Sequence, residues 1–128
     1  MILIIEKEDL NCQGQIYTIP TPLGIDISHH KRISVDNVYI EFSNPVGKSI
    51  IDVSTLLIDK TAGNPKQIIA SGFLEKSSKF FWLTSTSTET YKIQCRSLDE
   101  SLFHIHVFDE SQKERKIKKV RLVLKFDE

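Results

Sequence analysis

Cysteine is scarce in this sequence, and its low count excludes a disulfide-stapled fold. Only two cysteines occur among 128 residues, Cys12 and Cys95. Two thiols cannot build the framework of bridges that holds small secreted domains together, and they lack the Cys-x-x-Cys spacing of a zinc or redox site. We therefore expect both thiols to be free and the core to be held by apolar packing.

Long apolar runs are also missing. The run Ile2-Leu3-Ile4-Ile5 ends at Glu6 and has no basic stretch before it. A membrane span needs about 20 apolar residues, and a signal peptide needs a basic segment followed by about 7–15 apolar residues. The sequence therefore predicts a soluble cytoplasmic protein with no membrane partner.

The chain has no net charge, because 17 Lys and Arg balance 17 Asp and Glu. A neutral protein has no overall field that would draw it to nucleic acid or to an anionic membrane. Any electrostatic function must come from a local surface.

Helical periodicity is absent, and short β-type runs replace it. Segments rich in Ile, Val, Phe and Thr recur between turn signals such as Asn44-Pro45-Val46-Gly47 and Ala62-Gly63-Asn64-Pro65. These runs predict about nine strands, over 2–6, 15–19, 32–42, 49–58, 66–71, 79–84, 89–96, 102–108 and 117–126. Several have one apolar and one polar face, so we expect a single all-β domain over 1–128. An antiparallel two-sheet sandwich, jelly-roll or immunoglobulin-like, is favoured, and a closed β-barrel is the alternative.

The C-terminal third alternates clearly between apolar and polar residues. A loop from Ser97 to Ser101 would pair 89–96 with 102–108 so that Cys95 faces Phe103. Apolar residues of both runs would then share a face, because a slip of one residue reverses every side chain. The last run, 117–126, would add its own apolar side chains to the same face. This register predicts a three-stranded unit that keeps His104 and His106 on its outer surface.

That outer surface would be basic. It would carry Lys92, Arg96, His104, His106, Lys119, Arg121 and Lys125. Exposed sheet lysines often serve only solubility and protection against edge-to-edge aggregation. The alternative is a site for an anionic partner, for which an acidic protein surface fits better than nucleic acid because the face offers no aromatic side chain for bases to stack on.

Large apolar side chains point to both faces of the segment Phe80-Phe81-Trp82-Leu83. Such a strand is either a central one covered by a loop, or it presents Trp82 or Phe80 outward. An outward aromatic could stack on a sugar ring or anchor a protein interface. Tyr17 and Tyr39 could extend such a platform.

The spacing His104-x-His106-x-x-x-Glu110 resembles the metal-ligand motif of the cupin family. The resemblance covers seven residues and implies a metal held by His104, His106 and Glu110. It departs from the family because Leu98 and Ile117 stand where glycines flank the motif, and only 18 residues follow Glu110, too few for the second motif.

Catalytic and cofactor motifs are otherwise absent. Gly47-Lys48-Ser49 lacks the first glycine of a phosphate-binding loop, and no Gly-x-Ser-x-Gly elbow occurs. We therefore expect no cofactor and a non-enzymatic module that binds a protein partner or a second copy of itself. The alternatives are a carbohydrate-binding module that uses Trp82 and a small cupin-like metal enzyme.

Overall fold

The computed structural model describes residues 1–11, 15–20, 29–84, 89–94, 102–109 and 116–127, and these contain strands but no helix. Nothing in this part of the chain is therefore a helix long and apolar enough to cross a membrane. The strands are β1 (Ile2–Asn11), β2 (Ile16–Ile19), β3 (Arg32–Val46), β4 (Ser49–Thr55), β5 (Ile68–Leu74), β6 (Ser78–Thr84), β7 (Tyr91–Lys92), β8 (Phe103–Asp109) and β9 (Lys116–Asp127). Each predicted run overlaps one of them, although within 89–94, the described part of the run 89–96, only Tyr91 and Lys92 form a strand.

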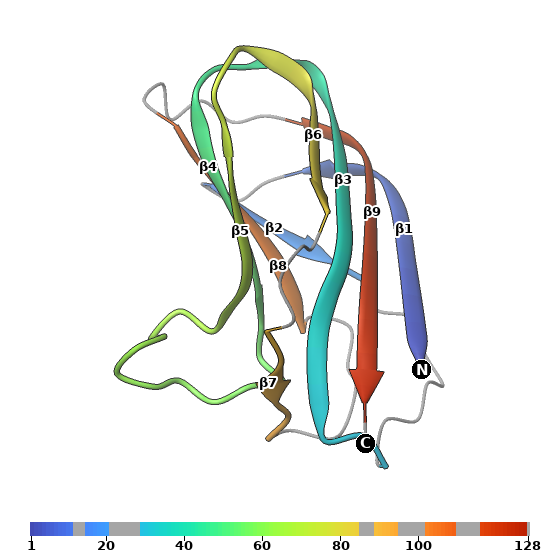
Figure 1. Ribbon diagram of the computed structural model, residues 1–128. Coiled ribbons are helices and arrows are strands. Elements are labelled where there is room, and N and C mark those ends of the chain that lie inside the picture. Colours follow the sequence, from blue (N-terminus) through green and yellow to red (C-terminus); the bar gives the residue numbers. More distant parts are fainter. Residues whose placement is uncertain (12–14, 21–28, 85–88, 95–101, 110–115, 128) are drawn as a thin grey trace.

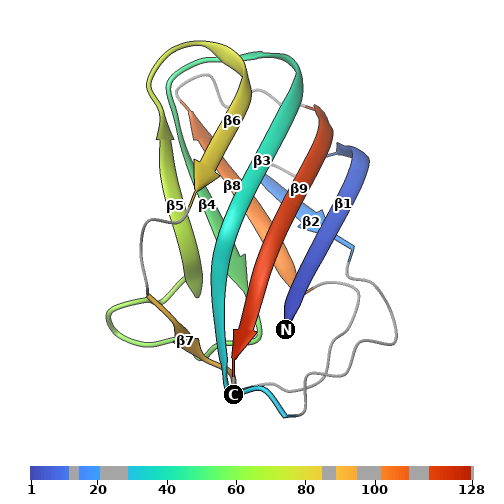
Figure 2. The same cartoon turned by 45° about the vertical axis from the view of Figure 1, so that its right-hand side comes forward.

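The strands form two antiparallel sheets packed face to face (Figures 1 and 2). Sheet A has the order β1-β9-β3-β6, with β7 also pairing β3, and sheet B has the order β2-β8-β4-β5. The predicted sandwich is confirmed. The closed-barrel alternative is wrong, because each sheet ends in edge strands that pair on one side only within the described chain.

The strand order is nested. With β7 set aside, the first strand pairs the last (β1 with β9), the second pairs the last but one (β2 with β8), and β3–β6 and β4–β5 follow inward. Consecutive pairs alternate between the two sheets. This is the winding of a jelly roll, and it differs from the immunoglobulin order, so the structure selects the first of the two predicted sandwich types.

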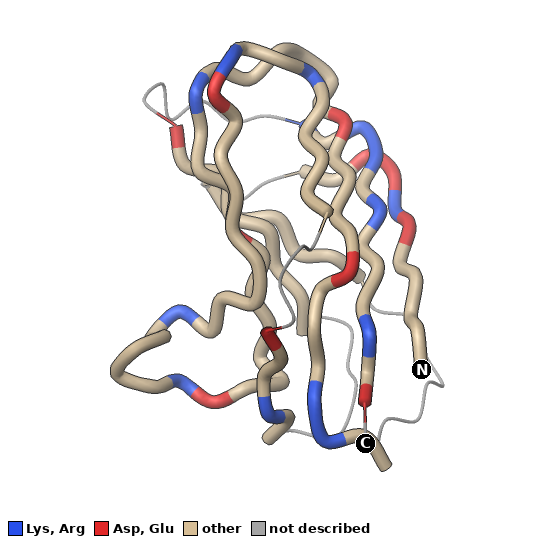
Figure 3. Tube along the Cα trace, viewed as in Figure 1, with Lys and Arg blue, Asp and Glu red and all other residues tan. Residues whose placement is uncertain are grey.

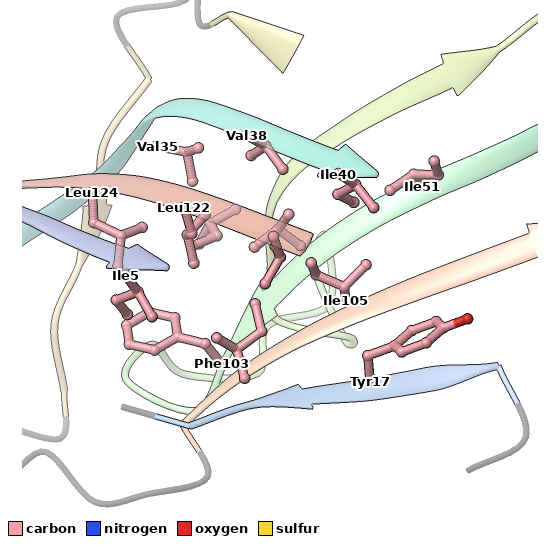
Figure 4. Packing of buried hydrophobic residues seen from close by; sticks show 14 of the residues in the cluster. Ile5, Tyr17, Val35, Val38, Ile40, Ile51, Phe103, Ile105, Leu122 and Leu124 are labelled. Atoms are coloured by element: carbon pink, nitrogen blue, oxygen red, sulfur yellow. The ribbon is translucent and has the colours of Figure 1, made fainter. Parts of the chain in front are cut away.

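A single apolar core fills the space between the sheets (Figure 4). Sheet A contributes residues such as Ile5, Ile40 and Leu122, while sheet B contributes Phe103 and Ile105, all of them with almost no exposed surface. Each such side chain stabilises the fold by about 1.5–3 kcal/mol relative to leaving it in water. The alternation read from the sequence therefore assigns the inward faces of β8 and β9 correctly.

The predicted three-stranded unit at the C-terminal end is wrong. Strand β7 pairs β3, with Tyr91 opposite Ile33, while β8 lies in the other sheet between β2 and β4. Alternation determines which face a side chain occupies, but the same alternation suits any neighbouring strand, so it could not identify the partner. Several positions on which the predictions from sequence rest lie outside the described residues: Cys12, Cys95, Arg96, Glu110 and the loop Ser97–Ser101.

Candidate functional site

Three aromatic side chains gather on the outer face of sheet A, and we call them the aromatic cluster (Tyr39, Phe80, Trp82). Phe80 and Trp82 are two residues apart on β6 and are 53% and 61% exposed. Tyr39 lies opposite Trp82 on β3, with ring centroids 5.4 Å apart in an edge-on arrangement, and its ring is 6.5 Å from that of Phe80. Such pairs add about 0.5–1.5 kcal/mol beyond the area they bury.

The alternative that placed Trp82 and Phe80 outward is therefore correct. The other alternative, a central strand covered by a loop, is wrong. Strand β6 is an edge strand of sheet A, and only Phe81 of its aromatic residues is buried. Tyr39 extends the platform as expected. Tyr17 does not, because it is 2% exposed and lies in the core between the sheets (Figure 4).

A shallow groove of about 560 Å³ runs from the aromatic cluster across the same face. Trp82 and Tyr39 line one end, and the exposed Ile2 and Ile4 of edge strand β1 line the other. Charged and amide groups lie between and beside them, from Glu6, Asp36, Asn37, Lys119 and Arg121. The outer face of sheet A therefore combines apolar anchors with groups that form hydrogen bonds.

The basic residues from Lys116 to Arg121 in β9 lie beside acidic residues of the flanking strands (Figure 3). Arg121 Nε lies 3.3 Å from Glu6 Oε1 across the β1–β9 pair, and Lys119 stands in register with Glu8 on one side and Glu41 on the other. Two further pairs join these strands, Lys116 with Asp9 at 3.2 Å and Lys118 with Glu41 at 3.3 Å. Because opposite charges alternate across the strands, this surface is of mixed charge rather than basic.

The residues predicted to share one basic surface are divided between three places. Lys119, Arg121 and Lys125 lie on the outer face of sheet A, and Lys92 lies on β7 beside β3. His104 and His106 lie on the outer face of sheet B. The single basic surface therefore does not form, because its premise was the wrong strand pairing.

A network of polar side chains occupies the outer face of sheet B. The hydroxyl of Ser54 lies 3.1 Å from Nε2 of His106, and Ser71 donates a hydrogen bond to Oδ1 of Asp52. Asp52, only 7% exposed, stands directly opposite His106 in the β4–β8 pair. His104 lies beside the same group, opposite Ser54.

Serine, histidine and aspartate are thus neighbours without forming the relay of a serine hydrolase. In such a relay the carboxylate accepts a hydrogen bond from the imidazole that activates the serine. Here the carboxylate of Asp52 accepts its hydrogen bond from Ser71, and the hydroxyl of Ser54 is almost fully covered. The network orients the imidazole of His106 and does not expose a nucleophile.

Both histidines are held in their neutral form more strongly than a free histidine. Burial lowers the pKa of His104. Burial also lowers the pKa of His106, reinforced by the neighbouring His104 and Lys66, while the carboxylate of Asp52 acts in the opposite direction. These shifts arise because partial burial removes water that would otherwise stabilise the protonated, charged imidazole.

The predicted metal ligands are only partly placed by the structure. His104 and His106 project from the same face of β8, as the resemblance to the cupin family implied, while Glu110 lies outside the described residues. Within the described ranges no three His, Cys, Asp or Glu side chains come together as a metal-binding group.

Sequence reasoning missed the partners of these histidines. Asp52 and Ser54 alternate with the apolar Ile51 and Val53, which is a signal for a polar outer face on β4. Nothing in the sequence could show that this face adjoins β8, because the strands are distant in the chain.

Comparison with known proteins adds little. The chain matches no protein-family model and no curated protein. Among solved structures, the cryo-EM structure of Mud Crab Dicistrovirus can be superposed with a TM-score of 0.40 at 13% identity, over 98% of this chain and 77% of that one. At this level of likeness no function transfers from one protein to the other.

Proposed function

We propose that the protein is a non-enzymatic binding and assembly module whose protein partner is a second copy of the same chain. The observation that carries this proposal is the exposure of Phe80 and Trp82 together on an edge strand. Tryptophan and tyrosine dominate the binding energy of protein interfaces, and natural edge strands normally avoid large exposed apolar side chains.

Strand β6 has a geometry suited to pairing with itself. Its only charged residue is Lys79, and within the described chain its backbone pairs β3 alone. An antiparallel pair of β6 strands centred on Phe81 would place Phe80 of each copy opposite Trp82 of the other. A two-fold interface repeats each contact twice, so both aromatic pairs would form at once and sheet A would continue across the two copies.

Sedimentation velocity over a concentration series up to about 1 mM tests this directly, since a dissociation constant of 1 mM corresponds to about 4 kcal/mol. We expect a monomer–dimer equilibrium that the double variant Phe80→Ala/Trp82→Ala abolishes. Phe73→Ala is the matched control, because Phe73 is 72% exposed on β5, the edge strand of the other sheet. A monomer at every concentration, or an equal loss with Phe73→Ala, would overturn the proposal.

A carbohydrate ligand is the second candidate function, and the groove on sheet A favours it. Trp82 lies in that groove with the hydrogen-bonding side chains of Asp36, Asn37 and Arg121. Sugar rings combine apolar faces with hydroxyl groups, so an exposed indole beside polar groups is suited to them. A glycan array compared between the natural protein and Trp82→Ala tests this candidate, and the absence of any Trp82-dependent signal would eliminate it.

A further inference from the structure

A second groove, separate from the aromatic cluster, lies on the outer face of sheet B. It has a volume of about 750 Å³, within the range of about 300–1,000 Å³ of small-molecule sites. Its floor is formed by β8 and its neighbours β2 and β4, and its wall by the connection between β4 and β5, the long green loop in Figures 1 and 2. We call it the sheet B groove.

The wall of the sheet B groove is fixed in place by hydrogen bonds. The backbone of Thr61 and Asn64 forms a bridge at the tip, and the side chain of Asn64 bonds both the amide and the carbonyl of Ile68. Gln67 returns a hydrogen bond to the carbonyl of Ile58, and Leu57 is buried beneath the loop. The groove is therefore pre-formed, which lowers the entropy lost when a ligand binds.

The ionisable side chains that line this groove are all basic. Lys60 and Lys66 come from the wall, and His104 and His106 come from the floor, while none of the described lining residues carries a carboxylate. Neither lysine has an acidic partner in the described part of the chain. This contrasts with sheet A, where acids on both flanking strands face the cations of β9.

Hydroxyl and apolar groups complete the lining. Thr18 offers a hydroxyl beside His104, and Lys66 Nζ lies 5.3 Å from the centre of the Phe108 ring. The ring of Phe108 also stacks near His106, with centroids 5.8 Å apart. Cationic donors thus lie next to a flat apolar surface.

We propose that the sheet B groove binds a small phosphate monoester, with the phosphate among the two lysines and two histidines and the organic group against Phe108. Planar carboxylates are best recognised by the paired donors of arginine, and no arginine is among the described residues that line the groove. Separate point donors such as lysine ammonium and imidazole groups suit the tetrahedral array of phosphate oxygens. This site does not depend on the proposed dimer, because it lies on the opposite sheet.

Proton uptake accompanies binding at such a site. In the free protein the pKa values of His104 and His106 are lowered by burial, so both imidazoles are largely neutral at neutral pH. Among the described residues, the charged groups facing them are Asp52 from β4 and Lys60 and Lys66 from the loop, while β2 contributes only Ile16 and Thr18. A bound dianion stabilises the protonated imidazoles, so anion affinity rises as pH falls through the histidine pKa values.

The test is an NMR titration of the imidazole resonances with phenyl phosphate. We expect saturable shifts of His104 and His106, with His29 and His30 as unaffected internal references. Lys66→Gln should weaken binding about tenfold, the loss expected when a hydrogen bond to a charged group is removed. Lys125→Gln, an exposed lysine on sheet A, is the matched control and should leave binding unchanged.

Two further probes sharpen the result. Inorganic phosphate should bind more weakly than phenyl phosphate because it cannot contact Phe108. Inorganic sulfate, whose charge is constant near neutral pH, should bind more tightly at about pH 6 than at about pH 8, because the imidazoles take up protons as the pH falls. Equal effects of Lys66→Gln and Lys125→Gln, unsaturable shifts, equal affinity for both phosphates or pH-independent sulfate binding would overturn the proposal. A monomeric protein in sedimentation would not affect it.

Discussion

The outer faces of the two sheets differ in how their charged side chains are paired. On sheet A, acids of β1 and β3 flank the cations of β9, so attraction occurs between neighbouring strands in open solvent. On sheet B, Asp52 and Ser54 are covered and bonded to neighbours, while Lys60 and Lys66 remain unmatched beside a groove. The difference shows that net charge alone is a poor guide, since a neutral protein can carry one balanced and one unbalanced surface.

The largest effect should come from the core on which both faces depend. Phe103→Ala removes a fully buried ring of β8 and should lower the free energy of unfolding by about 3–5 kcal/mol, because it loses burial and leaves a cavity. Urea denaturation monitored by both Trp82 fluorescence and circular dichroism measures this. Two separate transitions would show that the sheets unfold independently and that the comparison concerns two units.

A smaller loss is expected from the covered network on sheet B. Asp52→Ala removes the acceptor of the Ser71 hydroxyl and should destabilise the protein by about 1–3 kcal/mol, as for other hydrogen bonds to charged groups. Asp52→Asn keeps an acceptor oxygen and should lose less. If both variants match the natural protein in urea denaturation, the network is no more important than the exposed pairs of sheet A.

The pH dependence of stability should distinguish the faces further. Because the folded-state pKa values of His104 and His106 are lowered from 6.5, the unfolded chain takes up protons first as pH falls. Their contribution is therefore fully present above pH 6.5 and is lost progressively below it, until the folded-state pKa values are passed. The double variant His104→Gln/His106→Gln should flatten the decline in melting temperature between about pH 6.5 and pH 5. An unchanged decline would contradict this assignment.

The smallest effect should come from the exposed pair on sheet A. A double-mutant cycle of Glu6→Ala and Arg121→Ala should give a coupling of about 0.2–1 kcal/mol, since both side chains are about half exposed and screened by salt. The coupling should shrink further in about 1 M salt, where the screening length is only about 3 Å. A coupling as large as the loss from Asp52→Ala would erase the difference between the two faces.

Much of the fold prediction rested on the alternation of apolar and polar residues along the strands. Its failures have one cause. The inward position of Phe103 follows from a period of two residues, whereas the segment Phe80-Phe81-Trp82-Leu83 is apolar on both faces, so its alternation left the exposure of Phe80 and Trp82 open. That period says nothing about which distant strand lies alongside. The expected basic surface failed for this reason, and the groove formed by Lys66 with His106 was missed because it brings together residues 40 positions apart.

The nested pairing of strands also sets an order for folding. The inner pair, β4 with β5, closes only the connection 56–67, whereas β1 can pair only when β9, much later in the sequence, is available. Closing long loops costs entropy before any contact repays it, so β-sandwiches fold in about milliseconds to seconds rather than microseconds. During synthesis on the ribosome, Ile2 and Ile4 of β1 therefore have no β9 backbone to pair with until β9 has emerged. This edge of sheet A is completed last.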